Sequence, residues 1–173
     1  GGGACYDSES DRLIIVERGS QNSMNDVWSY DYSSNSWTDY SERDSDLSGG
    51  ITGIYYDIDD DVCIMLDDDR DTWSYDYDDD TWEEHHDTLD LDSQGHLLIY
   101  DIESDISIVV EEGGSGAANE VFSYNHDTET WTQMSDKPTD VWNDFSGVYD
   151  FASDISLFFW QSGGAGDGTY AYC

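Results

Sequence analysis

The stretch Asn25–Trp37, NDVWSYDYSSNSW, decides the fold because the chain repeats it. A second copy, DTWSYDYDDDTW, spans Asp71–Trp82, and a third copy, NEVFSYNHDTETW, spans Asn119–Trp131. A shortened fourth copy, GTYAYC, runs over Gly168–Cys173. Recurrence at this spacing indicates one supersecondary unit that is repeated along the chain.

A second phrase precedes each copy and begins with Tyr-Asp, followed by another Asp four residues later and then by an apolar run. Its tyrosines are Tyr6, Tyr56, Tyr100 and Tyr149, which lie 50, 44 and 49 residues apart. The apolar runs have the length of strands, and the Trp-Ser-Tyr segments are rich in β-forming residues between polar turns. Four short antiparallel strands per unit are the content of one propeller blade.

We therefore expect an all-β protein, a β-propeller with three complete four-stranded blades and a fourth blade that lacks its outermost strand. The expected units are about 1–44, 45–90, 91–140 and 141–173, in a single domain or in a fragment of a longer chain. Aromatic residues recur at fixed repeat positions, and we expect them to form the core between blades. These residues are Tyr6, Trp28, Tyr30, Trp37, Tyr56, Trp73, Tyr75, Trp82, Tyr100, Phe122, Tyr124, Trp131, Tyr149 and Tyr170.

The order of these segments resembles the Kelch repeat over nearly the whole chain. An inner strand ends in Tyr-Asp, an apolar strand leads towards a Gly pair such as Gly113–Gly114, and Asn-Asp-Val-Trp-Ser-Tyr-Asp is followed by Ser-Trp-Thr. The Gly pair is altered in the first unit and lost in the second. SYDYSSNSW also resembles the Asp-box turn of sialidases, but it is one residue too long and lacks the Gly. The Kelch resemblance implies a β-propeller that offers interaction surfaces more often than catalysis.

The charge of the chain excludes some partners. Lys and Arg number 5 against 41 Asp and Glu, which gives a formal net charge of −36. Nucleic acid is not expected, because phosphate contacts need clustered basic residues. Membrane insertion is not expected either, because no apolar run approaches the ~20 residues that a span requires. Such acidity fits a salt-adapted extracellular or cell-surface protein, or one whose carboxylates bind Ca²⁺.

Three cysteines occur without the spacing of a metal site. Cys63 lies in an apolar run, and we expect it to be a buried free thiol. Cys5 and Cys173 lie at opposite ends of the repeat array, which a closed ring would bring together. We therefore consider a Cys5–Cys173 disulfide, which requires Cα atoms within about 7 Å of each other.

The candidate metal ligands are Asp76, Asp78 and Asp80, whose carboxylates alternate as in a loop that wraps a cation. The competing interpretation is a solvated hairpin turn, since Thr81 stands where an EF-hand loop needs Gly. The histidines His85, His86, His96 and His126 share no ligand spacing, and we interpret them as surface or turn residues.

The sequence thus predicts a non-catalytic extracellular module for binding or assembly, with no required cofactor and with Ca²⁺ as the one candidate ion. A protein partner or self-association is expected, and a glycan is an alternative ligand. One alternative is a structural subunit of a filament or surface layer, joined by strand addition. The other is a glycan-active enzyme domain, since paired carboxylates can hydrolyse glycosides.

Overall fold

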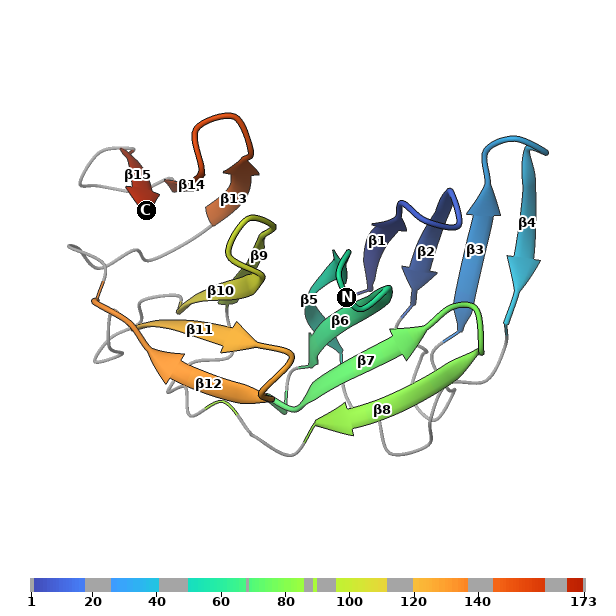
Figure 1. The fold of residues 1–173 in the computed structure, drawn as a ribbon, viewed down its shortest axis with the longest axis horizontal. Coiled ribbons are helices and arrows are strands. Elements are labelled where there is room, and N and C mark those ends of the chain that lie inside the picture. Colours follow the sequence, from blue (N-terminus) through green and yellow to red (C-terminus); the bar gives the residue numbers. More distant parts are fainter. Residues whose placement is uncertain are drawn as a thin grey trace. The chain divides into compact units, whose positions relative to one another are not determined.

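The computed structural model describes residues 2–17, 26–40, 50–67, 69–85, 89, 96–111, 120–136, 145–160 and 168–172. These residues form fifteen β-strands and no helix (Figure 1). Within them there is accordingly no helix of the length and apolarity that a membrane crossing requires. The prediction of an all-β protein is confirmed.

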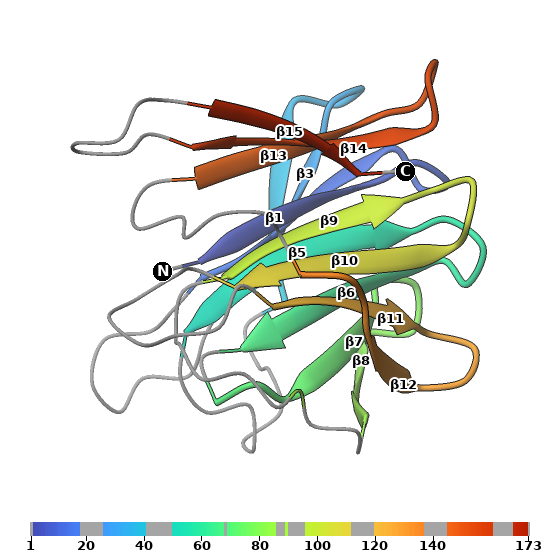
Figure 2. The ribbon, with the colours of Figure 1, turned by 90° about the vertical axis from the view of Figure 1, so that its left-hand side faces the viewer.

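The strands pair with their neighbours in chain order to form four antiparallel sheets. The first sheet contains β1 (Gly3–Asp7), β2 (Arg12–Val16), β3 (Val27–Asp31) and β4 (Ser36–Asp39). The second contains β5 (Ile51–Asp57), β6 (Val62–Asp67), β7 (Thr72–Asp76) and β8 (Thr81–His85). The third contains β9 (His96–Asp101), β10 (Ile106–Glu111), β11 (Val121–Asn125) and β12 (Thr130–Gln133). Figure 2 shows β9 and β10 side by side. The fourth contains β13 (Phe145–Asp150), β14 (Ile155–Trp160) and β15 (Gly168–Tyr172).

This is the predicted strand content, with three four-stranded sheets and one sheet of three strands in the described part of the chain. The chain divides into two compact units, Gly1–Thr88 and Leu89–Cys173, and each unit holds two sheets. The division falls close to the predicted boundary between the second and third repeats. That all four sheets form a single domain stays a prediction.

Each sheet has two distinct faces, because successive side chains of a strand point to opposite sides. The face that carries the tyrosine of the Tyr-Asp phrase is here called the tyrosine face, and the other is called the opposite face. In the first sheet, strand register aligns Tyr6 with Leu13, Leu13 with Tyr30, and Tyr30 with Trp37 on the tyrosine face. Cys5, Ile14 and their neighbours form the opposite face.

The core of unit 1 lies between the opposite face of the first sheet and the tyrosine face of the second sheet. The first sheet contributes Cys5, Ile14, Val16 and Val27, and the second contributes Ile51, Cys63, Met65, Trp73 and Tyr75. All of these side chains are at most 7% exposed. Burial of apolar area, at roughly 25 cal/mol per Å², is what holds the two sheets together.

Unit 2 repeats this arrangement with different residues. The third sheet contributes Ile99, Ile108, Val110 and Val121 from its opposite face, and the fourth contributes Phe158, with Tyr149 packed against the cluster. Gly147 lets the sheets approach closely, since a Cβ at this position would collide with the ends of Ile99 and Leu97. In unit 1 the glycine lies on the earlier of the two sheets instead, where Gly3 faces Ile54 of the second sheet.

The predicted pairing of the cysteines is wrong. Cys5 forms a disulfide with Cys63, and their Cα atoms are 6.5 Å apart. Cys5 is on β1 and Cys63 is on β6, so the bond joins the two sheets of unit 1 within their shared core. Cys63 is buried as expected, at 2% exposure, but it is not a free thiol. Cys173 lies outside the described residues.

Candidate functional site

The Tyr-Asp phrases build one kind of turn, which fixes the first hairpin of every sheet. In the first sheet Asp7 Oδ1 accepts the N–H groups of Glu9 and Ser10 at 2.9 and 3.0 Å, and the Tyr6 hydroxyl donates to Asp11 at 2.6 Å. The later Asp of the phrase has a positive φ in all four sheets, between 51° and 56°. Asp tolerates this left-handed conformation better than most residues, which explains its fixed position in the phrase.

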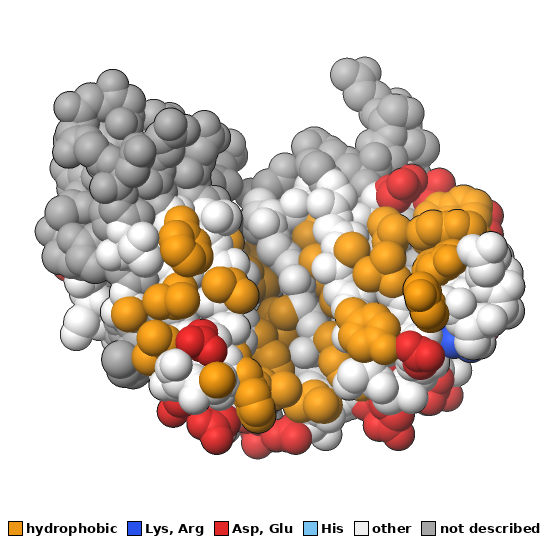
Figure 3. Space-filling model, turned by 90° about the horizontal axis from the view of Figure 1, so that it is seen from above, with side chains coloured by type: hydrophobic (Ala, Val, Ile, Leu, Met, Phe, Trp, Pro, Cys, Tyr) orange, Lys and Arg blue, Asp and Glu red, His pale blue; other side chains and the backbone are white. Residues whose placement is uncertain are grey.

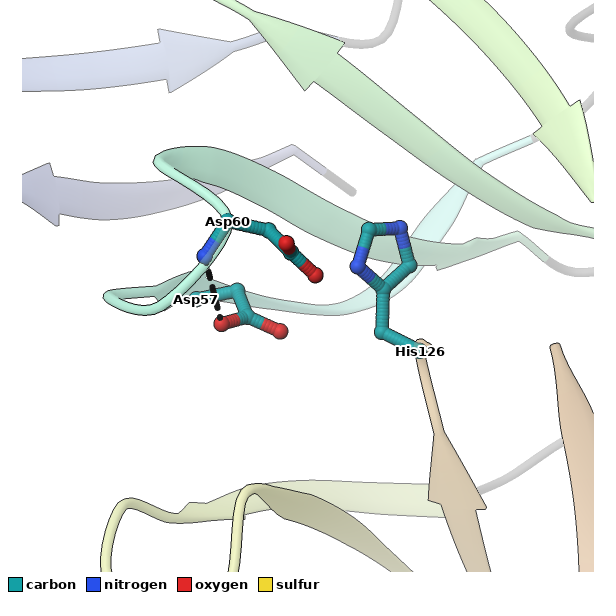
Figure 4. A group of neighbouring side chains, drawn as sticks. All are labelled: Asp57, Asp60 and His126. Carbon is teal, nitrogen blue, oxygen red and sulfur yellow. Dashed lines mark hydrogen bonds between the residues drawn. The ribbon is translucent and has the colours of Figure 1, made fainter. Parts of the chain in front are cut away.

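The turn between β5 and β6 repeats these contacts, and Figure 4 shows the hydrogen bond between Asp60 and the Asp57 carboxylate. Asp57 is 1% exposed, and its Oδ1 accepts the N–H groups of Asp59 and Asp60 at 3.1 and 3.4 Å. The Tyr56 hydroxyl donates to Asp61 at 2.6 Å. Burial and this hydrogen bond raise the pKa of Tyr56 well above its ordinary range.

The Trp-Ser-Tyr segments end in the same turn between the third and fourth strands. The Tyr30 hydroxyl donates to Asn35 Oδ1 at 2.7 Å, and the Tyr75 hydroxyl donates to Asp80 Oδ1 at 2.8 Å. The tyrosine ring also packs on the tryptophan of the facing strand, with ring centroids 4.8 Å apart for Tyr30 and Trp37. In the first two sheets, both phrases of the repeat therefore encode a hairpin whose tyrosine locks its own turn.

The predicted calcium ligands Asp76, Asp78 and Asp80 all lie at the β7–β8 turn. Asp76 Oδ1 accepts the N–H groups of Asp78 and Asp79 at 2.9 and 3.1 Å, while Asp80 accepts the hydroxyl of Tyr75. Asp78 accepts a 3.4 Å hydrogen bond from the Ser10 hydroxyl. Two of the three carboxylates thus have a role in the turn without a cation, and the calcium site stays a prediction.

The structure corrects one interpretation of the histidines. His85 is the last residue of β8 and is only 4% exposed, so it is not a surface or linker residue. His126 lies in a turn as expected. His86 and the side chain of His96 lie outside the described residues.

The tyrosine face of the first sheet is exposed and aromatic, and it is the candidate binding surface. Tyr6 and Trp37 are 53% and 54% exposed, and Tyr32, in the adjoining turn, is 79% exposed. Hydrophobic side chains gather at the right of Figure 3, where Figure 1 places the first sheet. The surface contains a hollow of about 400 Å³ lined by Tyr6, Asp11, Leu13, Tyr30 and Tyr32.

The same face of the second sheet is buried. Cys63, Trp73 and Tyr75 are at most 2% exposed there, because the first sheet covers them. Tyr77, the counterpart of Tyr32, is within hydrogen-bonding distance of Ser29 at 3.5 Å and accepts a 3.0 Å hydrogen bond from Tyr40. The exposure of the first sheet's tyrosine face is therefore a property of its place in the chain, not of its residue types.

The ion pair of the first sheet lies on its opposite face, because strand register aligns Asp7, Arg12 and Asp31 with one another on that side. Arg12 Nη2 lies 3.2 Å from Asp31 Oδ2, and hydrogen bonds from Ser33 and Ser34 lower the pKa of Asp31 to about 2. The hydrogen bond with Asp11 raises the pKa of Tyr6. The tyrosine face thus offers phenol rings and the side chain of Asp11, which accepts the Tyr6 hydroxyl, and the guanidinium of Arg12 is not part of it.

The expectation that all the repeat aromatics form a core is wrong for Tyr6 and Trp37, which are half exposed. It holds for Trp73, Tyr75, Phe122 and Tyr124, each at most 9% exposed, whereas Trp28 is only partly buried. The other partly buried members are Tyr30, Tyr56, Trp82, Tyr100, Trp131 and Tyr149. The side chain of Tyr170 lies outside the described residues.

Comparison with known proteins identifies the fold. No protein-family model matches the chain, and no curated protein sequence matches it. Among solved structures, YjhT matches with a TM-score of 0.59 and 12% identity, over 91% of this chain and 54% of YjhT. TolB from Acinetobacter baumannii matches with a TM-score of 0.60 and 15% identity, over 93% of this chain and 38% of TolB. Both are propeller-type folds, so the predicted β-propeller fold is confirmed. The chain spans only about half of the first of these proteins and less of the second.

Proposed function

We propose that the protein is a non-catalytic, extracellular module for binding or assembly, built on a Kelch-like propeller, and that it binds a protein through the tyrosine face of its first sheet. The observation that carries this proposal is the exposure of Tyr6, Tyr32 and Trp37, at 53%, 79% and 54%. Large apolar side chains grouped on a surface mark interaction sites in soluble proteins.

The composition of the surface supports a protein partner. Tyr and Trp are among the residues that most often dominate the energy of protein interfaces, and this surface has Tyr6, Tyr32 and Trp37. Its rings are held in place by cross-strand packing and by the locked turns, so little conformational entropy is lost on binding. A glycan stacked on the same rings is the alternative ligand.

The disulfide and the charge support an extracellular location. Disulfides persist in oxidising compartments and are rare in reducing ones, and Cys5–Cys63 is such a bond in the core of unit 1. A net charge of −36 keeps a surface hydrated in concentrated salt, where short screening lengths suppress its self-repulsion. Salt or Ca²⁺ is thus proposed to tune stability, not to take part in catalysis.

A structural role by strand addition is the second proposal, and one feature of the fourth sheet favours it. In the described residues β15 is an edge strand that pairs only with β14. An exposed edge can accept a strand from another chain. Loss of assembly when Pro replaces Ala171, with no loss when it replaces Ser8, an exposed first residue of a turn, would support this role.

A photo-crosslinking residue at Tyr32 tests the main proposal. The intact protein is irradiated in an extract of its source cells and medium, and the adducts are identified by mass. We expect a discrete polypeptide adduct at Tyr32 and none at the control position Asp79, which is exposed in the corresponding turn of the second sheet. Equal, indiscriminate labelling at both positions would refute the proposal, and a glycan adduct would replace the protein partner by a glycan. Turnover of a polysaccharide by the purified chain would refute the non-catalytic part.

A further inference from the structure

We infer that the tyrosine face of the first sheet binds the opposite face of the fourth sheet in a second copy of this chain. This inference rests on the proposed function, because it names the partner of the same surface. Both faces are apolar, and each corresponds to a face that the other sheets of the chain bury.

Unit 1 shows what a tyrosine face binds. The tyrosine face of the second sheet is covered by the opposite face of the first sheet, through Cys5, Ile14, Val16 and Val27. Next to this contact, Ser29 and Tyr40 bind Tyr77. Tyr32 is the counterpart of Tyr77 in the first sheet, and it is 79% exposed.

Unit 2 makes the same contact with other side chains. The opposite face of the third sheet, with Ile99, Ile108 and Val110, packs against Phe158 and Tyr149 on the tyrosine face of the fourth sheet. Two different residue sets thus form one mode of packing. In each unit, the opposite face of the earlier sheet covers the tyrosine face of the later sheet.

The fourth sheet has an opposite face of the same kind, and it is exposed. Strand register makes Val148, Leu157, Phe159 and Ala171 the counterparts of Cys5, Ile14, Val16 and Ser29. Val148 is 52% exposed and Phe159 is 41% exposed, whereas Cys5 and Val16 are 4% and 0% exposed. None of these four side chains is charged, although the chain holds 41 acidic residues.

One polar contact should complete the interface. Burial and Asp61 raise the pKa of Tyr56, and Asp7 of the preceding sheet contributes to this shift. The pKa of Tyr149 is raised similarly, with a contribution from Asp101 of the preceding sheet. Asp150 is the next member of this series, so it would face Tyr6 of the second copy. Because the two faces are different, the pairing is head-to-tail, and it leads to a ring or an open chain of copies.

Engineered cysteines test the pairing with conservative changes. Leu13 is the counterpart of Cys63, and Val148 is the counterpart of Cys5, so Leu13→Cys and Val148→Cys should bond as Cys5 and Cys63 do. The two single variants, each with Cys173→Ala, are mixed at about 2 M NaCl and allowed to oxidise in air. We expect a covalent heterodimer at least about tenfold above that from Ile58→Cys mixed with Val148→Cys, because disulfides demand close Cα atoms. Ile58 is a matched control, 42% exposed but in a turn.

Sedimentation velocity of the unmodified chain gives the second measurement. The mean mass should rise with protein concentration at about 2 M NaCl, and Tyr32→Glu with Trp37→Glu, or Val148→Glu with Phe159→Glu, should each keep the chain monomeric. A mixture of these two double variants should restore 1:1 dimers, since each retains the face that the other lacks.

Three outcomes would overturn the inference. The first is a chain that stays monomeric at all concentrations, and the second is a Leu13→Cys, Val148→Cys double variant that crosslinks only within one chain. The third is loss of association through the first-sheet variant alone, which would mean that this face pairs with itself. If the chain stays monomeric while Tyr32 still crosslinks to another protein, the proposed function stands and only the self-pairing fails.

Discussion

At the scale of single residues, a repeat tyrosine holds its hairpin turn where its hydroxyl donates to the residue five positions later, and its burial sets how much this hydrogen bond contributes. These tyrosines are Tyr6, Tyr30, Tyr56, Tyr75, Tyr100 and Tyr149. Tyr75 is fully buried and donates to Asp80, whereas Tyr30 is half-buried and donates to Asn35 in an exposed turn. Tyr75→Phe should lower the free energy of unfolding by roughly 1 kcal/mol, the net value of a typical hydrogen bond. Tyr30→Phe should lower the free energy of unfolding by less, because water can donate to Asn35 in place of the lost tyrosine hydroxyl. Urea unfolding of both variants at equal salt measures the difference, and equal losses would contradict this account.

Asp67 is a buried carboxylate that destabilises the fold at neutral pH. It is 1% exposed, and burial raises its pKa from 3.8 to about 6, although the N–H groups of Asp69 and Asp71 donate to it. Between pH 3.8 and about 6 the folded chain binds more protons than the unfolded chain, so the Asp67 contribution to stability falls as pH rises through this window.

Asp67→Asn removes this charge and keeps an oxygen that can accept both N–H groups. We expect the variant to be more stable than the parent at pH 7 by roughly 1–2 kcal/mol, after allowing for solvent screening. The gain should vanish near pH 4, where Asp67 is protonated in the folded chain. Asp59→Asn, an exposed change of the same charge, is the control. A gain that does not depend on pH would show that Asp67 is not the titrating group.

At the scale of elements, the Cys5–Cys63 bond joins two neighbouring sheets across 58 residues of chain. Replacing both cysteines by Ala should lower the free energy of unfolding by roughly 2–4 kcal/mol, because closing a loop of this length restricts the unfolded chain. Cys173→Ala should leave the bond in place, which peptide mass mapping without reduction can show. A Cys5–Cys173 peptide in the parent would contradict the observed pairing.

Gly147 sets the distance between the sheets of unit 2. Gly147→Ala should destabilise by roughly 1–3 kcal/mol, since a Cβ there collides with the ends of Ile99 and Leu97 and overpacks the core. Ile99→Val removes the methyl group that the new Cβ meets first, so the double variant should lose less than the sum of the single variants. Thermal unfolding of the four proteins of this cycle tests the coupling, and additive losses would argue against the contact.

The same elements show what could be predicted from the sequence. The strands follow from local patterns, because Tyr-Asp phrases, apolar runs and polar turns determine hairpins within a few residues of each other. The disulfide partner of Cys5 depends instead on which faces of neighbouring sheets pack together. The sequence does not specify this packing, because every repeat has the same pattern of residues at equivalent positions. Tyr6 and Trp37 were expected in the core for a related reason, since a repeat predicts equal environments, whereas an end sheet has one face without a neighbour in its unit. The locked turns could have been found, because the Asp at a fixed distance from each Tyr was visible in the sequence.

At the scale of the whole molecule, charge governs stability. Folding concentrates a net charge of −36, and at ~0.1 M ionic strength the Debye length of about 10 Å leaves neighbouring carboxylates repelling one another. The melting temperature should therefore rise steadily as the NaCl concentration is raised to ~2 M, where the Debye length is below about 3 Å. A variant with Asp59 and Asp79 changed to Asn, and Glu9 and Glu103 changed to Gln, should melt at a higher temperature at low salt, and its melting temperature should depend less on salt. These four carboxylates are exposed, so their loss acts mainly through the net charge.

Calcium must be separated from this screening. A Ca²⁺ bound by Asp76, Asp78 and Asp80 stabilises only the folded chain, so ~1 mM CaCl₂ should raise the melting temperature above that in NaCl of equal ionic strength. Asp78→Asn is the informative variant, because Asp76 and Asp80 also hold the turn through hydrogen bonds to backbone and to Tyr75. If Asp78→Asn abolishes the gain and Asp59→Asn does not, the cation binds at this turn. Identical melting temperatures in the two salts would mean that the carboxylates of this turn only stabilise the hairpin. The acidity of the chain would then be explained by adaptation to high salt.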